Sequence, residues 1–101
     1  MSWTKVASLA DIPQGTMKQV TIDDLDIALY HTAEGLFATS DVCTHASAFL
    51  TDGKLVGCIV ECPKHGGKFD VKTGAAKAFP CVIPVETFAV ETRGEEIWLD
   101  A

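Results

Sequence analysis

Hydrophobic and polar residues alternate along much of this chain with a period of two, which is typical of strands with one buried face. The alternation predicts short strands at 20–22, 25–30, 87–91 and 97–99. A helical turn is expected at 47–50. Turn signals rich in glycine and proline separate these segments, at 13–15, 33–35, 52–53, 66–67, 73–74 and 93–95. Many short strands with tight turns predict an all-β fold, either a sandwich or a small barrel.

The chain has the size and composition of one globular domain. It has 101 residues, of which 48% are hydrophobic and 22% charged, which excludes a disordered protein. The aromatic residues on or near the strands are expected to pack in the core or at sheet edges; these are Trp3, Tyr30, Phe37, Phe69, Phe88 and Trp98. Basic residues do not interleave with them, so a base-stacking surface is not predicted.

The charge is acidic and unevenly distributed. The net charge of −6 argues against binding to nucleic acid or to an anionic membrane. Residues 43–81 carry five lysines against three acidic residues, a net charge of +2, so the remainder carries −8. The sequence shows no secretory signal and no apolar run of membrane-spanning length, so we expect a cytoplasmic protein. In the cytoplasm the four cysteines are expected to be thiols or metal ligands. A Cys58–Cys81 disulfide would argue against a cytoplasmic location.

Two segments place cysteine and histidine close together. The first is Cys43-Thr44-His45, and the second is the stretch CPKHGGKFD that begins at Cys62 and contains His65; sixteen residues lie between His45 and Cys62. Each Cys–His pair is short enough to occupy one loop and bind one metal ion. The two glycines that follow His65 lack a Cβ, so backbone N–H groups can approach the sulfur atoms of a buried cluster.

This arrangement resembles the Rieske iron–sulfur family, in which two histidines replace two cysteines on one iron of a 2Fe–2S cluster. The resemblance extends over nearly the whole chain. It implies that Cys43 and Cys62 bind one iron and that His45 and His65 bind the other. The segment 78–80 resembles the family's third loop, which covers the cluster from the side. The implied fold is a single Rieske domain over 1–101, with an antiparallel β-sandwich base from 1–41 and 82–101 and a cluster-binding subdomain at about 42–81.

Details of the motif distinguish branches of that family. Rieske proteins of respiratory cytochrome bc complexes carry two further cysteines that form a disulfide, and a serine and a tyrosine whose hydroxyls donate to the cluster. The matching positions here are Ala48 and Lys64 for the disulfide, and Gly67 and Phe69 for the hydroxyls. Without those donors reduction is harder, which predicts a potential near the low end of the Rieske range, about −150 mV. Gly67→Ser is expected to raise the potential if the loop tolerates a side chain.

The chain resembles more closely the ferredoxins of bacterial aromatic-ring-hydroxylating dioxygenase systems. That resemblance implies a monomeric one-electron carrier, not an enzyme, between a flavin-dependent NAD(P)H ferredoxin reductase and a terminal oxygenase in aromatic hydrocarbon catabolism. Two alternatives stay open: a Rieske protein of another redox system such as nitrite reduction, and a zinc-bound interaction module, since two cysteines and two histidines also suit zinc. An oxygenase would need a further iron held by two histidines and a carboxylate, and only His31 remains.

The residues outside the motif have simpler expectations. His31 is expected to be a surface residue without a role, and Cys58 and Cys81 to be small buried apolar residues. A carrier must bring its cluster close to the partner's cofactor, so the outer ring edges of the two ligand histidines are expected near solvent. Phe49 and Pro80 are candidates for the dry centre of the partner contact, and Lys64 and Lys68 would attract an acidic partner surface.

Overall fold

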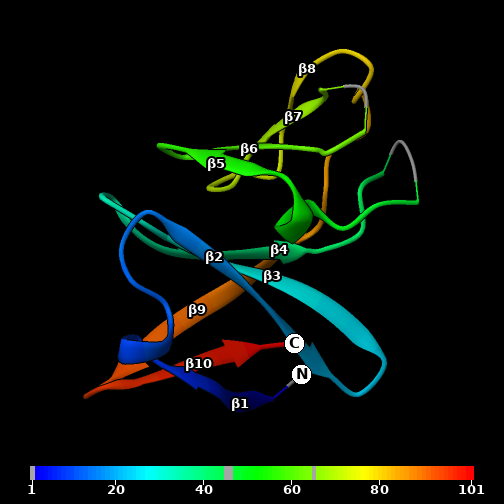
Figure 1. Cartoon of the computed structure of the whole chain (residues 1–101). Helices are drawn as coiled ribbons and strands as arrows, with labels where there is room; N and C mark the ends of the chain where they lie inside the picture. The colour runs from blue at the N-terminus through cyan, green and yellow to red at the C-terminus, as the bar shows by residue number, and fades with distance from the viewer. Residues whose placement is uncertain (1, 45–46, 65) are drawn as a thin grey trace.

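The computed structural model describes residues 2–44, 47–64 and 66–101. Six strands form the larger sheet, in the order β1-β10-β9-β4-β3-β2 with antiparallel neighbours. They are β1 (Trp3–Ser8), β2 (Thr16–Ile22), β3 (Leu25–Thr32), β4 (Gly35–Ser40), β9 (Thr87–Arg93) and β10 (Glu96–Asp100). Only two residue pairs join β4 to β9, so the sheet folds into two three-stranded halves that enclose one core (Figure 1). The all-β fold expected from the alternation is confirmed, and of its two forms the base is the sandwich that the resemblance implied.

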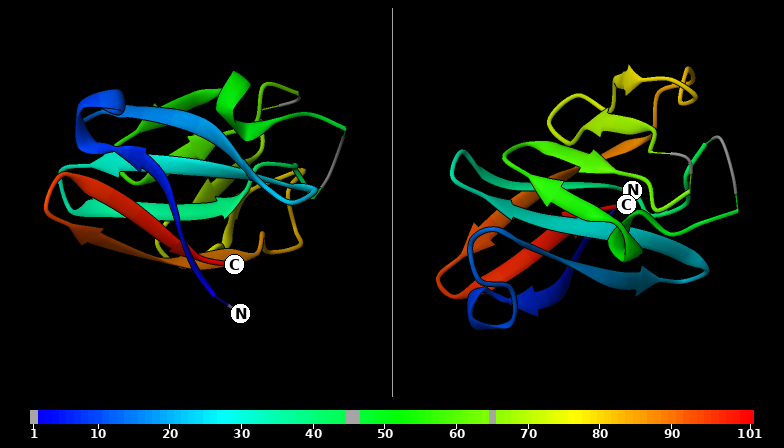
Figure 2. Two further views of the ribbon diagram at one scale, coloured as in Figure 1. Left: turned by 90° about the horizontal axis from the view of Figure 1, so that it is seen from below. Right: turned by 45° about the horizontal axis from the view of Figure 1, so that its top comes forward.

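A second sheet lies over one face of this base. Its strands are β5 (Lys54–Val56), β6 (Ile59–Glu61), β7 (Lys68–Asp70) and β8 (Ala76–Ala78), paired antiparallel in that order. Figure 1 shows this sheet stacked on the β3–β4 side, with both chain termini on the far side of the base, and Figure 2 gives two further views. Its entry is tight at Gly53, where an added Cβ would lie 1.8 Å from the Glu61 carbonyl oxygen. Glycine therefore lets the chain start β5 directly beside β6.

Strand β3 separates the two cores of the molecule. Ile27 and Leu29 point into the core of the base, whereas Ala28 and Tyr30 point into the core under the small sheet. All four are completely buried. The Tyr30 hydroxyl is paired with Thr39 Oγ1 at 2.9 Å, so its polar end is satisfied inside the protein. Both faces of β3 are thus fixed, which anchors the small sheet to the base.

The predicted helical turn at 47–50 is wrong in position. The structure instead has two 3-10 turns, η1 (Leu9–Asp11) and η2 (Leu50–Asp52), and no helix in the described part of the chain has the length or apolar character of a membrane span. Ser47 lies in a bend and Phe49 has an extended backbone, and the Ala48 carbonyl between them accepts the Cys43 N–H at 2.9 Å. The turn forms later because Gly53 N–H closes on the Leu50 carbonyl at 2.9 Å.

The aromatic residues divide between core and edge as predicted. Tyr30 and Phe69 are completely buried, whereas Trp3 on β1 is 38% exposed. Arg93 lies over the ring of Trp98, 4.2 Å from its centroid, and 6.0 Å from that of Trp3. This stack covers the edge of the base with a cation–π contact, far in the fold from the small sheet (Figure 1).

Candidate metal centre

Three cysteines meet in the core beneath the small sheet. Cys43 follows β4, Cys62 follows β6 and Cys81 follows β8, and they are 4%, 1% and 3% exposed. The sulfur atoms of Cys43 and Cys81 are 3.9 Å apart. Phe69 and Leu50, both completely buried, are part of the same cluster. The fold therefore brings the two predicted cysteine ligands into one dry site, together with a third thiol.

The two ligand loops close in the same way. The N–H of Cys43 donates to the Ala48 carbonyl at 2.9 Å, and the N–H of Cys62 donates to the Gly67 carbonyl at 2.7 Å. Each bond makes a compact loop that begins at its cysteine. The Thr44 hydroxyl donates to the Ile83 carbonyl at 2.8 Å. This bond ties the first loop to the third, which in the structure continues past segment 78–80 to residue 83. His45 and His65 belong to these loops but lie outside the described residues, so their predicted solvent-facing edges stay a prediction.

The buried sulfurs resist ionisation in the absence of a cation. Burial raises the pKa of the Cys62 thiol, and the neighbouring Cys43 sulfur raises it further, while a hydrogen bond from the Lys64 backbone lowers it. Burial and then Cys43 raise the pKa of the Cys81 thiol to about 12. Thiolates crowded into an apolar site need a metal centre to neutralise them, and a backbone donor to a ligand sulfur is typical of iron–sulfur sites. The Cys43 and Cys62 sulfurs are therefore suited to bind an iron–sulfur cluster.

Gly67 is packed directly against Cys81. A Cβ added at Gly67 would lie 2.2 Å from the Cys81 sulfur, 3.2 Å from its Cβ and 3.3 Å from its backbone nitrogen. The prediction that Gly67→Ser raises the potential required a loop that tolerates a side chain. That requirement is not met, because the loop has no room for one at position 67 while Cys81 stays in place. The close approach, rather than a left-handed backbone, explains the glycine at this position.

A buried carboxylate that the sequence analysis missed holds the first ligand loop. Asp41 is completely buried and accepts hydrogen bonds from Gln19 Nε2 at 2.7 Å, from Thr51 N–H at 2.8 Å and from Thr51 Oγ1 at 2.7 Å. Its carbonyl also accepts the Leu50 N–H at 2.7 Å. Asp41 thus joins the start of the loop to its end and to β2. Its only signal in the sequence is an acidic residue beside a metal-binding motif.

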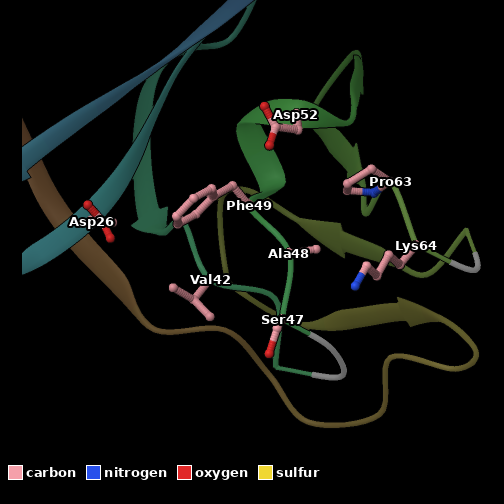
Figure 3. A pocket seen from close by; sticks show the side chains of 8 residues that line it. All are labelled: Asp26, Val42, Ser47, Ala48, Phe49, Asp52, Pro63 and Lys64. Carbon is pink, nitrogen blue, oxygen red and sulfur yellow. The ribbon is translucent and has the colours of Figure 1, made fainter.

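An open groove runs between the first and second ligand loops (Figure 3). Its volume is about 590 Å³, and its lining residues are Asp26, Val42, Ser47, Ala48, Phe49, Asp52, Pro63 and Lys64. Phe49 forms an apolar wall and is 41% exposed. Ala48 and Lys64, the positions matched to the bc-type disulfide, line the same groove, as expected for residues that face each other across the two loops.

The third loop exposes apolar residues that the sequence analysis did not select. Phe79, Val82 and Ile83 are 85%, 69% and 59% exposed. Pro80, the residue chosen from the sequence, is only half-exposed. Val82, Ile83 and Pro80 line a shallow pocket with Thr44 of the first ligand loop. The apolar surface beside the site is therefore larger than Phe49 and Pro80 alone would make it.

Two expectations outside the motif are corrected. His31 is half-buried, and its Nδ1–H donates to the Ile12 carbonyl at 2.8 Å, so it fixes the chain after η1 and is not without a role. Cys58 packs against the core under the small sheet but is only half-buried, with its sulfur also 3.3 Å from Glu34 Oε2 and 3.5 Å from Thr32 Oγ1. Cys81, by contrast, is buried as predicted. No disulfide joins any of the four cysteines, all of which lie in the described part of the chain.

The described residues alone do not complete a metal site. In 2–44, 47–64 and 66–101, no group of three or more histidine, cysteine, aspartate or glutamate side chains is placed to hold a metal ion. Two of the four predicted ligands, His45 and His65, lie outside those ranges. The structure thus places the sulfur half of the predicted ligand set.

Comparison with known proteins identifies the family. Residues 2–89 match the family model described as the Rieske [2Fe-2S] domain. The chain is 37% identical over 98 residues to the ferredoxin component of the naphthalene 1,2-dioxygenase system of Pseudomonas aeruginosa, covering 97% of this chain and 94% of that protein. The ferredoxin of Sphingomonas yanoikuyae B1 superposes with a TM-score of 0.93 at 39% identity, covering 99% of both chains.

A further solved structure is a complex of reduced oxygenase and oxidized ferredoxin in carbazole 1,9a-dioxygenase. A chain of that complex superposes on this one with a TM-score of 0.91 at 38% identity, covering 96% of this chain and 91% of that chain. The family match spans both predicted ligand loops and the third loop. This chain therefore belongs to the Rieske family, and its cofactor is one 2Fe–2S cluster.

Proposed function

We propose that this chain is a one-electron carrier whose cluster is held by Cys43 and Cys62 on one iron and by His45 and His65 on the other. The observation that carries the proposal is the burial of the Cys43 and Cys62 sulfurs in one core, at the starts of two loops that each contain a histidine. The cluster, when bound, takes up and releases a single electron. The chain itself binds the cluster, excludes water from its cysteine side and presents it to partners.

The same proposal includes the division of the chain into two parts. The base comprises 1–41 and 82–101, and the cluster-binding subdomain comprises about 42–81. The sheet topology supports this division, because β5 to β8 pair only with one another in the described part of the chain. Asp41 stands at the boundary, and its hydrogen bonds to β2 and η2 hold the first ligand loop against the base.

The proposed partners are a terminal aromatic-ring-hydroxylating oxygenase, which accepts the electron, and a flavin-dependent NAD(P)H reductase, which supplies it. Relatives over nearly the full chain are ferredoxin components of dioxygenase systems, and one similar ferredoxin is found in complex with its oxygenase. As those relatives are carriers and not the oxygenase, we assign this chain no reaction of its own. The aromatic substrate would be selected by the oxygenase, a separate chain.

The proposed contact surface surrounds the ligand loops. The exposed side chains of Phe79, Val82 and Ile83 supply apolar area on the third loop, and Phe49 supplies it on the groove side. Redox contacts of this kind are small, usually under about 1,200 Å² in total, so a few such residues are a large part of the interface. Lys64 adds positive charge between the loops, whereas Lys72 is paired with Glu34 at 3.0 Å.

We also propose that the protein is a monomer in the cytoplasm. For the compartment, the support is that the four cysteines are free, which fits a reducing environment.

The test is a spectrum and an iron assay on freshly purified protein and on single variants. Cys43→Ala, Cys62→Ala, His45→Ala and His65→Ala are each expected to lose iron and visible absorbance, because binding of the cluster is coupled to folding of the loops. Cys58→Ser is the matched control and is expected to keep both. A colourless wild-type protein containing zinc would overturn the proposal, since zinc is d¹⁰. Loss of iron from Cys58→Ser would contradict the ligand assignment.

A further inference from the structure

Cys81 is a third thiol that the ligand set does not use. It is 3% exposed, and its sulfur lies 3.9 Å from the sulfur of Cys43. Its backbone N–H donates to the Ala78 carbonyl at 3.1 Å, which fixes the residue in the third loop. That loop is in turn tied to the first ligand loop by the hydrogen bond from Thr44 to Ile83, at 2.8 Å. The position of this thiol beside a cluster ligand is therefore set by the fold.

The opposite side of Cys81 is equally constrained. Its sulfur occupies the space that a Cβ at position 67 would fill, at 2.2 Å from the ideal Cβ position. The thiol thus lies in a slot between the Cys43 loop and the loop that carries Cys62. Because Cys81 is only 3% exposed, the thiol has its hydrogen-bonding partner inside the protein, and the Cys43 sulfur lies 3.9 Å away.

The chemistry of the two sulfurs makes Cys81 the donor. A ligand cysteine is a thiolate and can only accept, whereas an ordinary thiol carries its proton at neutral pH and burial favours that neutral form. We propose that the Cys81 S–H donates a hydrogen bond to the Cys43 sulfur and thereby raises the reduction potential of the cluster. This inference rests on the proposed function, because it requires Cys43 to be a ligand.

The direction of the effect follows from charge. Reduction adds one negative charge to the cluster and its sulfur ligands, so a donor to a ligand sulfur stabilises the reduced form more than the oxidised form. A hydrogen bond donated by a thiol is weak, which limits the change in the redox equilibrium constant of the cluster to about two- to fivefold. For a one-electron couple this corresponds to about 20–40 mV, at about 59 mV for each tenfold change. Cys81 would thus offset part of the effect of missing hydroxyl donors.

The first experiment is a redox titration of the holoprotein against a reference dye. Cys81→Ala is expected to shift the equilibrium about two- to fivefold toward the oxidised cluster. Cys81→Ser keeps a donor in nearly the same volume, so its potential should lie above that of Cys81→Ala. Cys58→Ala removes the other non-ligand thiol and should match wild type. A Cys81→Ala potential equal to that of wild type, with an intact visible spectrum, would overturn the inference.

The second experiment observes the native thiol. In Cys58→Ala holoprotein, with Cys43 and Cys62 bound as thiolates, Cys81 carries the single S–H group of the chain. Its infrared stretching band is expected to move to lower frequency when the cluster is reduced, because the acceptor sulfur becomes more negative. A band that is unchanged on reduction would contradict the hydrogen bond. Both results differ from failure of the proposed function, in which wild-type protein would show no iron–sulfur absorbance at all.

Discussion

Replacing Gly67 by alanine tests the packing of the three loops around the site. The added methyl would lie 2.2 Å from the Cys81 sulfur, so the two groups must separate by about 1.5 Å to reach an ordinary contact distance. The Cys81 Cβ at 3.2 Å and its backbone nitrogen at 3.3 Å are also close to the added methyl, so rotation of the thiol alone does not relieve the crowding. Overpacking of this kind costs about 1–3 kcal/mol, and the constrained backbone places Gly67→Ala at about 2–3 kcal/mol.

The assay is urea unfolding of the anaerobic holoprotein, followed by visible absorbance, with iron content measured on the same samples. Gly67→Ala is expected to lower the free energy of unfolding by about 2–3 kcal/mol and to reduce iron content. The double variant Gly67→Ala/Cys81→Ala removes the sulfur and leaves a Cβ–Cβ approach of 3.2 Å, so it should recover most of the loss relative to Cys81→Ala alone. A Gly67→Ala protein as stable as wild type, or two substitutions whose effects simply add, would refute this account of the packing.

Three further predictions concern the loop anchor and the partner surface. Asp41→Ala leaves the donors of β2 and η2 unpaired and should lower stability by about 2–4 kcal/mol in urea unfolding, and a change under about 0.5 kcal/mol would show that Asp41 does not anchor the loop. Phe79→Ser should slow the second-order reaction with oxygenase by at least about threefold with an unchanged spectrum. Val56→Ser, at another exposed apolar residue, should react as fast as wild type. Equal rates for Phe79→Ser and wild type would exclude the third loop from the contact. Lys64→Glu should slow the same reaction at low salt, and its difference in rate from wild type should shrink as ionic strength rises. Lys18→Glu on β2 supplies the same charge change as a control. Identical salt dependence of the two variants would show that Lys64 does not steer the partner.

Periodicity predicted β3, β9, β10 and the end of β2, and it missed β1 and β4. It succeeds where one face of a strand is buried in a single core. Val20 on β2 and Ile97 and Leu99 on β10 are buried while their neighbours are more exposed, which is the pattern the alternation describes. The alternation failed as a guide on β3, where Ala28 and Tyr30 are as deeply buried as Ile27, because a second core lies on that face. Strands of three residues, such as those of the small sheet, are too short for a period to show.

The chemistry of the site could be predicted where it depends on residue type and spacing. Cys43 and Cys62 were chosen on those grounds, and the fold brings their sulfurs into one core. The roles of Asp41 and Cys81 depend on which atoms lie beside them after folding, such as the Thr51 N–H and the Cys43 sulfur. Those neighbours are far apart in the sequence, and no local pattern marks them. The helical turn lies at η2 for the same reason, since its first residues, Leu50 and Thr51, are held by hydrogen bonds to Asp41.

The most direct test of the central claim is a coulometric redox titration of the purified protein, followed by electron paramagnetic resonance. The account predicts uptake of one electron per chain, with a midpoint in the Rieske range and near its lower end, about −150 mV, since two neutral imidazoles leave the oxidised cluster uncharged and Gly67 and Phe69 carry no hydroxyl donor. A midpoint near about −400 mV, the value of plant-type clusters with four thiolates, would contradict the histidine ligands. Failure to take up any electron would contradict the assignment of the chain as a carrier.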